Sequence, residues 1–303
     1  MKEKKVYTIL VTYNAMPWIE RCIGSLQASS MPTKVIVVDN HSADATMDFI
    51  RSHYPDIILL PQERNLGFGQ ANNIGIRYAL EHDATHVLLL NQDAWIEEKM
   101  IETLLQYDDN NSLLSPIHLN GEGDAIDANF KRNAIERSYE YERFKTEQEK
   151  GTNGKYSTYE INAACWLLPR KILEETGGFN PLFFHYAEDT DYLQRLHYHG
   201  KGVYFVSGTY CYHDRAHAPK KLPTRQSIYQ QLVLRAVDIN YSPAACWGHR
   251  IRYGVAVWHT ALVALRPNDI RLYYQALAEF YGKQKEIRQN REILKSKGAH
   301  WLS

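Results

Sequence analysis

The residues best suited to chemistry are short polar side chains that come directly after apolar runs. Three such runs, VYTILV, VIVV and HVLLL, each lead into carboxylate, hydroxyl or amide groups, which are Thr12, Asn14, Asp39, Asn40, Asn91, Gln92 and Asp93. Groups of this kind cap turns and helices, and they also hold ligands or divalent cations. Turn chemistry explains any one of these sites, whereas three together favour a binding site.

A cluster of acidic residues follows the aromatic stretch FFHYA. Glu188, Asp189 and Asp191 stand within four positions at the start of a predicted helix. The helix dipole favours acidic residues in a first turn, which explains the cluster without any catalysis. Carboxylates that are crowded and partly desolvated have raised pKa values, which would suit a general base. Both interpretations stay open on these residues alone.

Two histidines follow another apolar run. His213 and His217 have the H-x-x-x-H spacing of some zinc sites, but H-E-x-x-H and a Cys pair are absent from the sequence. A single imidazole that completes a site around Asp93 is therefore the better interpretation. The alternative for Asp93 is that it caps a helix beginning near Ile96.

The glycine-rich stretch at 63–76, ERNLGFGQANNIGI, precedes a predicted helix and contains Asn65, Gly67 and Asn73. Backbone N–H groups at such a helix start can bind phosphate. The signal is weak by itself, because no complete G-x-G-x-x-G follows a strand.

The order of the predicted elements indicates an α/β fold. Strands are predicted at 6–14, 34–40, 56–62 and 86–93, and helical patterns lie between them. This alternation predicts a mostly parallel sheet covered by helices on both faces. Ligands of such sheets bind outside the carboxyl ends of the strands, where the polar residues fall.

The chain divides into four predicted parts. Residues 1–117 and 159–224 form two parts of one domain, 118–158 is a polar and glycine-containing insertion or flexible flap between them, and 225–303 is a helical extension. One helix of this extension has an apolar stripe made of Ile251, Val255, Trp258, Leu262 and Leu265.

Composition excludes several classes of protein. Lys and Arg (35) balance Asp and Glu (35), so no broad field attracts nucleic acid. The four cysteines are scattered, which indicates reduced thiols in the cytoplasm. The apolar run at the N-terminus is too short for a signal peptide, and the 12-residue segment 254–265 falls short of the roughly 20 residues that span a bilayer.

The order of the motifs resembles one family. The series is V-T-Y-N, V-V-D-N-x-S-x-D, N-x-G-F-x-x-A-N-N-x-G, L-L-L-N-x-D, G-G-F with E-D-x-D and R, and a late His. It is similar to the inverting family 2 glycosyltransferases of the GT-A fold, and more narrowly to the bacterial rhamnosyltransferase-like branch. The resemblance runs from Val6 to His213, about two thirds of the chain.

The resemblance implies a GT-A domain over residues 1–224, with 1–117 as the nucleotide-binding half and 159–224 as the acceptor and catalytic half. It also implies a UDP- or dTDP-sugar donor. Its pocket would be lined by Thr12, Asn14, Asp39 and Asn40, with Asp39 accepting from the imide of the base. The nucleotide and its sugar would be bordered by Asn65, Gly67, Asn73, Asn91 and Gln92.

The resemblance also implies a metal and a base. Asp93 and His213 would hold Mn²⁺ or Mg²⁺ under the diphosphate, and Asp189 would take the proton of the acceptor hydroxyl. Glu188 and Asp191 would support it, with Arg195 orienting the pair. Two departures from the pattern are Asn91 in the first metal-motif position and His217, which competes with His213.

The expected role is polysaccharide synthesis in the bacterial envelope, with a glycan or lipid-linked acceptor at the inner face of the membrane. The alternatives are a nucleotidyltransferase and a catalytically silent sugar-nucleotide-binding scaffold. An ordinary helical core is the favoured interpretation for Trp247, Trp258, Arg250 and Arg252, while a peripheral membrane contact or a homodimer through these helices stays open.

Overall fold

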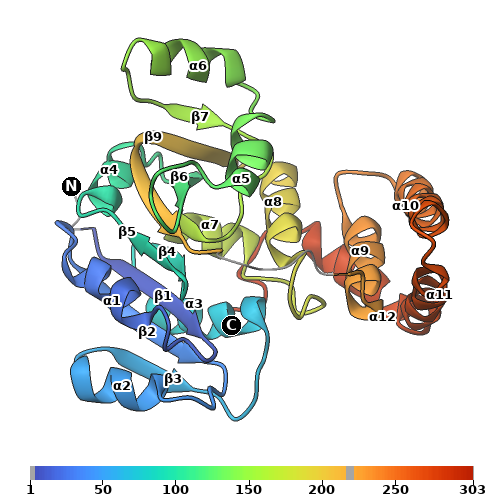
Figure 1. Cartoon of the computed structure of the whole chain (residues 1–303), viewed down its shortest axis with the longest axis horizontal. Coiled ribbons are helices and arrows are strands. Elements are labelled where there is room, and N and C mark those ends of the chain that lie inside the picture. The colour runs from blue at the N-terminus through green and yellow to red at the C-terminus, as the bar shows by residue number, and fades with distance from the viewer. Residues whose placement is uncertain (1–3, 216–221, 303) are drawn as a thin grey trace.

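A mixed sheet lies at the centre of the computed structural model, which describes residues 4–215 and 222–302 (Figure 1). Its strands are β1 (Val6–Thr12), β2 (Thr33–Asp39), β3 (Ile58–Pro61), β4 (His86–Asn91), β5 (Ala94–Ile96), β6 (Ser112–Asn120), β7 (Lys155–Ser157), β8 (Cys165–Pro169) and β9 (Gly202–His213). Among the described residues they follow the order β3-β2-β1-β4-β8-β6-β9-β5, and β7 also pairs with β9.

The first half of the sheet is parallel, as the alternating pattern predicts. β1 pairs in parallel with β2 on one side and with β4 on the other. β8 then runs antiparallel to both β4 and β6, so the sheet is mixed beyond that point. The register places Thr12 opposite Asp39 and Val11 opposite Asn91, which brings the polar ends of three strands to one edge.

Helices cover both faces of this sheet. They are α1 (Ile19–Gln27), α2 (Thr46–His53), α3 (Phe68–Glu81), α4 (Met100–Gln106), α5 (Ala128–Phe130), α6 (Tyr141–Glu149), α7 (Arg170–Thr176) and α8 (Glu188–Tyr198), with a π-helical turn at Lys131–Ile135. Ile9 of β1 packs with the core under α3, α7 and α8, whereas Leu10 packs with the core under α1, α2 and α4. This alternation is what a strand buried on both sides requires.

The segment 118–158, expected as an insertion or flap, packs against the sheet. Phe130, Ile135, Phe144 and Tyr156 are buried in the same core as β1 and α3. Phe205 of β9 lies within 6.0 Å, between ring centroids, of Phe130, Phe144 and Tyr156. Only a few apolar residues in this largely polar segment make the packing, so the sequence did not predict that the segment packs against the sheet.

The C-terminal helices form a separate apolar cluster beside α8. They are α9 (Arg225–Val237), α10 (Pro243–Val263), α11 (Pro267–Gly282) and α12 (Gln284–Leu294). Phe183 and Ala187, which precede α8, belong to the same cluster as α9, α11 and α12. α10 and α11 form the outer end of the molecule, away from the sheet (Figure 1).

The large apolar side chains of α10 are exposed, and the helical core favoured for Trp247 and Trp258 is wrong, because these side chains are 58% and 38% exposed. Val255 and Leu262 are 64% and 62% exposed. The buried positions of α10 are instead the small residues Cys246, Gly254 and Ala261. In the part of the chain that the structure describes, no helix is both long and apolar enough to span a membrane.

Candidate active site

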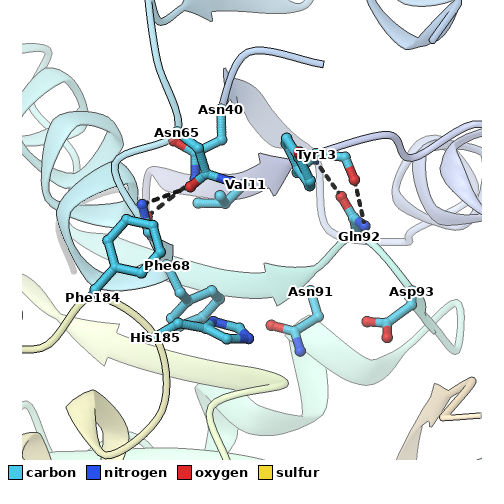
Figure 2. Close-up of a pocket in the computed structure, with 11 residues that line it drawn as sticks. Val11, Tyr13, Asn40, Asn65, Phe68, Asn91, Gln92, Asp93, Phe184 and His185 are labelled. Carbon is cyan, nitrogen blue, oxygen red and sulfur yellow. Dashed lines mark hydrogen bonds between the residues drawn. The ribbon is translucent and has the colours of Figure 1, made fainter. Parts of the chain in front are cut away.

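A cavity of about 390 Å³ opens at the edge of the sheet where β1, β2 and β4 end. Figure 2 shows side chains from the β4–β5 turn on one side of it and from the loops before α3 and α8 on the other. The lining residues are Val11, Tyr13, Asn40, Asn65, Gly67, Phe68, Asn91, Gln92, Asp93, Phe184 and His185. The cavity therefore collects six of the residues that the sequence nominated.

Asp39 lies at the end of β2, at this edge of the sheet. Its carboxylate accepts hydrogen bonds from the Thr12 hydroxyl (2.8 Å), from the Ser42 hydroxyl (2.5 Å) and from the Ser42 backbone N–H (2.9 Å). A carboxylate has about four acceptor positions, so these three bonds leave one unused. Asp39 is buried, and neither it nor Thr12 or Asn14 is among the residues that line the cavity. Asn14 accepts from the Ala43 N–H (2.8 Å), and so Thr12, Asn14 and Asp39 fix the β2–α2 turn.

Asn40 connects this turn to the glycine-rich loop. Its side-chain amide donates to the Gly67 carbonyl (3.1 Å), and its side-chain oxygen accepts from the Leu66 N–H (3.1 Å). Asn65 accepts from the Gly67 N–H (2.8 Å). Gly67 has a φ of +80°, and a Cβ there would lie 1.8 Å from the Phe184 carbonyl oxygen. Only glycine allows the loop to approach Phe184 this closely.

Two of the nominated amides hold backbone rather than offering free groups. Gln92 accepts from the Tyr13 N–H (2.7 Å) and donates to the Tyr13 carbonyl (3.3 Å), as Figure 2 shows. Asn73 is buried on α3, where it accepts from the Phe179 N–H (2.7 Å) and donates to the Phe179 carbonyl (2.8 Å). Asn73 thereby positions the loop that leads to the acidic cluster.

Asp93 and His213 come together because of strand register. β5 runs antiparallel to β9 with Ala94 opposite His213, and the Asp214 N–H donates to the Asp93 carbonyl (2.9 Å). The Asp93 carboxylate consequently lies 3.4 Å from Nε2 of the buried His213 ring. The competing ligand of the sequence analysis, His217, lies outside the described residues.

This pair suits a divalent cation. A carboxylate oxygen and an imidazole nitrogen at 3.4 Å can bind the same ion. The nearby Asn91 Oδ1 is buried and accepts no hydrogen bond from the described residues. Within residues 4–215 and 222–302, no three His, Cys, Asp or Glu side chains form an ion site by themselves. A cation held here would therefore need oxygens from a ligand, such as a diphosphate.

Arg215 links this pair to the acidic cluster. Its Nε donates to His213 Nδ1 (3.2 Å), which places the proton of a neutral ring on Nε2, facing Asp93. A cation could bind Nε2 only in the other tautomer, in which Nδ1 carries the proton and no longer accepts from Arg215. Arg215 also lies 3.4 Å from the buried Asp127. Its positive charge acts on Asp189 and opposes the rise in the pKa of that carboxyl.

The acidic cluster begins on strained backbone. Tyr186 and Ala187 both have positive φ values (+70° and +73°), which side-chain-bearing residues rarely adopt. Two such residues in sequence mark a conformation that the surrounding structure imposes, as occurs at functional sites. They turn the chain so that α8 starts with Glu188 and Asp189.

Burial raises the pKa of both Glu188 and Asp189 above the usual range, and for Glu188 the charges of Asp189 and Asp191 add to the rise. Glu188 Oε2 is buried and has no hydrogen-bond partner among the described residues. Asp189 is half-buried and accepts from the Thr190 N–H (2.8 Å). The half-buried Asp189 is thus the more accessible of the two bases.

Asp191 has a supporting position. It is buried, it accepts from Arg195 Nε (3.0 Å), and the amide of Asn180 donates to it (3.2 Å). Arg195 also donates to the carbonyls of Thr176 and Gly178 (2.7 Å each). This buried pair fixes the loop before α8, so Arg195 orients Asp191 rather than Asp189.

Several residues of the site escaped the sequence analysis. Tyr13, Phe68, Phe184 and His185 line the cavity, and only the aromatic run before Glu188 gave a signal for the last two. Glu160 gave none, although burial and the charge of Asp189 raise its pKa. It reaches the cluster through tertiary contact alone.

The architecture and this site define a GT-A glycosyltransferase. Among solved structures, the chain is similar to S. aureus TarS 1–349 in complex with UDP-GlcNAc, with a TM-score of 0.61, 15% identity and coverage of 96% of this chain and 90% of that one. It is also similar to GalNAc-T7 with UDP, GalNAc and Mn²⁺, with a TM-score of 0.66, 15% identity and coverage of 99% and 56%. At this identity the likeness shows the fold alone.

Residues 7–177 match the model of glycosyl transferase family 2, and the chain belongs to that family. A relative in Mycobacterium tuberculosis (strain ATCC 25618 / H37Rv), the N-acetylglucosaminyl-diphospho-decaprenol L-rhamnosyltransferase, is 28% identical over 71% of this chain and 78% of its own length. The dTDP-rhamnosyl transferase RfbF of Shigella flexneri is 33% identical over 35% of each chain. The resemblance noted in the sequence is confirmed.

Proposed function

We propose that the protein transfers a sugar, with inversion at the anomeric carbon, from a UDP- or dTDP-sugar to a hydroxyl of a lipid-linked or growing glycan. The observation that carries the proposal is the Asp93–His213 pair, 3.4 Å apart, with Asp93 lining the cavity. The names of the relatives, one acting on a diphospho-decaprenol acceptor and one on a dTDP-rhamnosyl donor, support this substrate class.

In this proposal the cavity holds the nucleotide. Asp39 has one acceptor position left for the imide N–H of uracil or thymine, while Asn40 and Asn65 hold the glycine-rich loop around it. Asp93 and His213 would bind Mn²⁺ or Mg²⁺, which as a Lewis acid would stabilise the charge that develops on the leaving diphosphate. The free oxygen of Asn91 would face the same ligands.

Asp189 is the proposed base. Its carboxylate takes the proton of the acceptor hydroxyl while that oxygen bonds to the anomeric carbon, and the bond from this carbon to the diphosphate breaks on the opposite face. The sugar carries positive charge in the transition state, so a fixed carboxylate stabilises it. The raised pKa of Asp189 makes it a stronger base than an exposed aspartate.

Two rival functions have less support. A nucleotidyltransferase would need a basic glycine-rich loop early in the chain, whereas β1 is followed by YNAMPW. A silent scaffold would fit the replacement of a metal-motif carboxylate by Asn91, but it would not need an unpartnered, high-pKa Glu188 next to Asp189.

A donor screen tests the proposal. The protein is incubated with a panel of UDP- and dTDP-sugars and Mn²⁺, and released nucleoside diphosphate is measured with and without EDTA. We expect hydrolysis of one donor class that EDTA abolishes. Release of pyrophosphate from a nucleoside triphosphate and sugar phosphate would show a nucleotidyltransferase, and binding without turnover of any donor would show a scaffold. With an acceptor in hand, the anomeric NMR signal of the product reports inversion.

A further inference from the structure

One face of α10 presents large apolar side chains to solvent. Trp247, Ile251, Val255, Trp258 and Leu262 are spaced by three or four residues, so they share a face, and they are between 38% and 64% exposed. Tyr274 of α11 extends this face, since its ring lies 6.0 Å from that of Trp258 and is 54% exposed. We call these six residues the α10 face.

The exposure follows from the packing of the helix. The buried positions of α10 are Cys246, Gly254 and Ala261, and the last two stand three or four residues from Trp258, so they adjoin the α10 face. A Cβ on Gly254 would lie 2.4 Å from the Tyr273 hydroxyl, so α10 and α11 approach too closely for a larger residue there. The fully buried side chains of α10 are thus small, while its largest apolar side chains are exposed.

The charges of the α10 segment itself are of one sign. Residues 241–268 contain Arg250, Arg252 and Arg266 but neither Asp nor Glu. Arg250 lies over the ring of Phe280, and Arg266 pairs with Asp269 of α11 (3.2 Å), whereas Arg252 is exposed. A second copy docked on the same face would bring the exposed Arg252 of each copy closer, which disfavours a symmetric dimer.

We propose that the α10 face docks in the interface of an anionic lipid bilayer, with α10 lying parallel to the membrane plane. Tryptophan and tyrosine rings prefer the headgroup level, aliphatic residues insert below it, and arginine attracts anionic headgroups. In this arrangement the protein contacts the membrane through α10 and α11, which form the outer end of the molecule (Figure 1).

The inference rests on the proposed function for its purpose. A depression of about 390 Å³ runs from Thr190, next to the proposed base Asp189, past Arg235 of α9 to His249 on the inner side of α10. Glu160 and Asp238 also line this depression, so it offers an acceptor a polar surface between α10 and the residue next to Asp189. Arg235 is held over the Tyr253 ring and supplies a positive charge along this surface.

Vesicle flotation tests the proposal. Wild-type protein should float with vesicles that contain 30% phosphatidylglycerol and bind pure phosphatidylcholine weakly, and about 0.5 M salt should reduce the binding. Val255→Glu with Leu262→Glu should lower partitioning about tenfold or more. Arg252→Glu should lower it about fivefold on anionic vesicles and little on neutral ones.

Ile293→Glu is the matched control, because Ile293 is also apolar and 43% exposed in the C-terminal helices but lies on α12. It should float like the wild type. Wild-type protein that stays unbound, or variants that float equally well, would overturn the proposal. A dimer in sedimentation analysis that Val255→Glu dissociates would assign the face to a second copy instead. Donor hydrolysis in solution should be the same in all of these variants as in the wild type. Absence of hydrolysis in the wild type would contradict the proposed function but not the docking.

Discussion

At the scale of single residues, the account depends on Asp93 and His213 acting as one pair. They lie 3.4 Å apart because β5 and β9 are in register. We predict that Asp93→Asn or His213→Gln weakens the Mn²⁺-dependent binding of UDP or dTDP by about tenfold or more and leaves metal-free binding unchanged. Titration calorimetry with and without Mn²⁺ measures both. His53→Gln, at an exposed position on α2, should bind as the wild type does; equal affinities in all variants would place the cation elsewhere.

Asp189 sets the acidic limb of the proposed reaction. Burial raises the pKa of Asp189, while burial and the charges of Asp189 and Asp191 raise the pKa of Glu188 to about 8, so an ionised Asp189 keeps Glu188 protonated. A base acts in its deprotonated form, so transfer should fall as pH drops through the raised pKa of Asp189. Because Glu188 is neutral there, we predict that Glu188→Gln leaves the acidic limb of kcat/KM in place, as Glu63→Gln in an exposed loop does. A limb that moves to lower pH in Glu188→Gln alone would show that Glu188 ionises before Asp189.

At the scale of elements, the glycine-rich loop and the loop before α8 must touch. Gly67→Ala would combine a φ of +80° with a Cβ 1.8 Å from the Phe184 carbonyl oxygen. We predict a loss of stability of about 1–3 kcal/mol and at least about tenfold weaker nucleotide binding. Gly24→Ala on α1, where no atom lies within 4 Å, should instead stabilise by about 0.5–1 kcal/mol. Thermal unfolding and calorimetry report both, and a harmless Gly67→Ala would show that the two loops move apart readily.

The elements that could be predicted were the strands whose own sequence is apolar enough to require burial. The strands ending at Thr12, Asp39 and Asn91 are apolar on both faces, and their polar ends met at one edge because parallel strands must do so. The α10 helix was predicted as a helix, but periodicity does not say which side is buried. The side of α10 that packs on α11 is the side of Gly254, whose lack of a side chain allows the close approach.

The roles within the site were only partly predictable for a related reason. Glu160 and Arg215 act on Asp189 from distant parts of the sequence, so no local spacing connects them to it. Asn73 belongs to a sequence motif, yet both its side-chain nitrogen and its side-chain oxygen are hydrogen-bonded to the backbone of Phe179. A motif marks where a residue belongs, whereas its partners depend on tertiary packing.

At the scale of the whole molecule, the C-terminal helices hold the acidic cluster in place. Asn290 of α12 and Asn180 exchange two hydrogen bonds (2.9 and 3.0 Å), and Asn180 also donates to Asp191. The chain then returns to the sheet, where the Gly178 N–H donates to the His300 carbonyl (2.9 Å) and Leu302 enters the core. The helical extension is therefore part of the site's support, although the sequence presented it as a separate unit.

This support can be tested away from the cavity. Asn290→Ala removes two hydrogen bonds from the buried Asn180 amide, which keeps its bonds to Asp191 and Leu182, so we predict a loss of about 1–3 kcal/mol in the free energy of unfolding, together with a lower kcat. Gln289→Ala is the control, because Gln289 precedes Asn290 in the sequence and its side chain is exposed. Denaturant titration and steady-state kinetics would measure the effects. A variant as stable and as active as wild type would mean that α12 contributes little to the position of α8.

The most direct test of the central claim is the effect of Asp189→Asn on transfer and on nucleotide binding, measured on the same preparation. The account predicts that donor and Mn²⁺ bind with wild-type affinity, because Asp93 and His213 are untouched, while transfer falls by about a thousandfold or more. Transfer at the wild-type rate would show that Asp189 does not take the acceptor's proton.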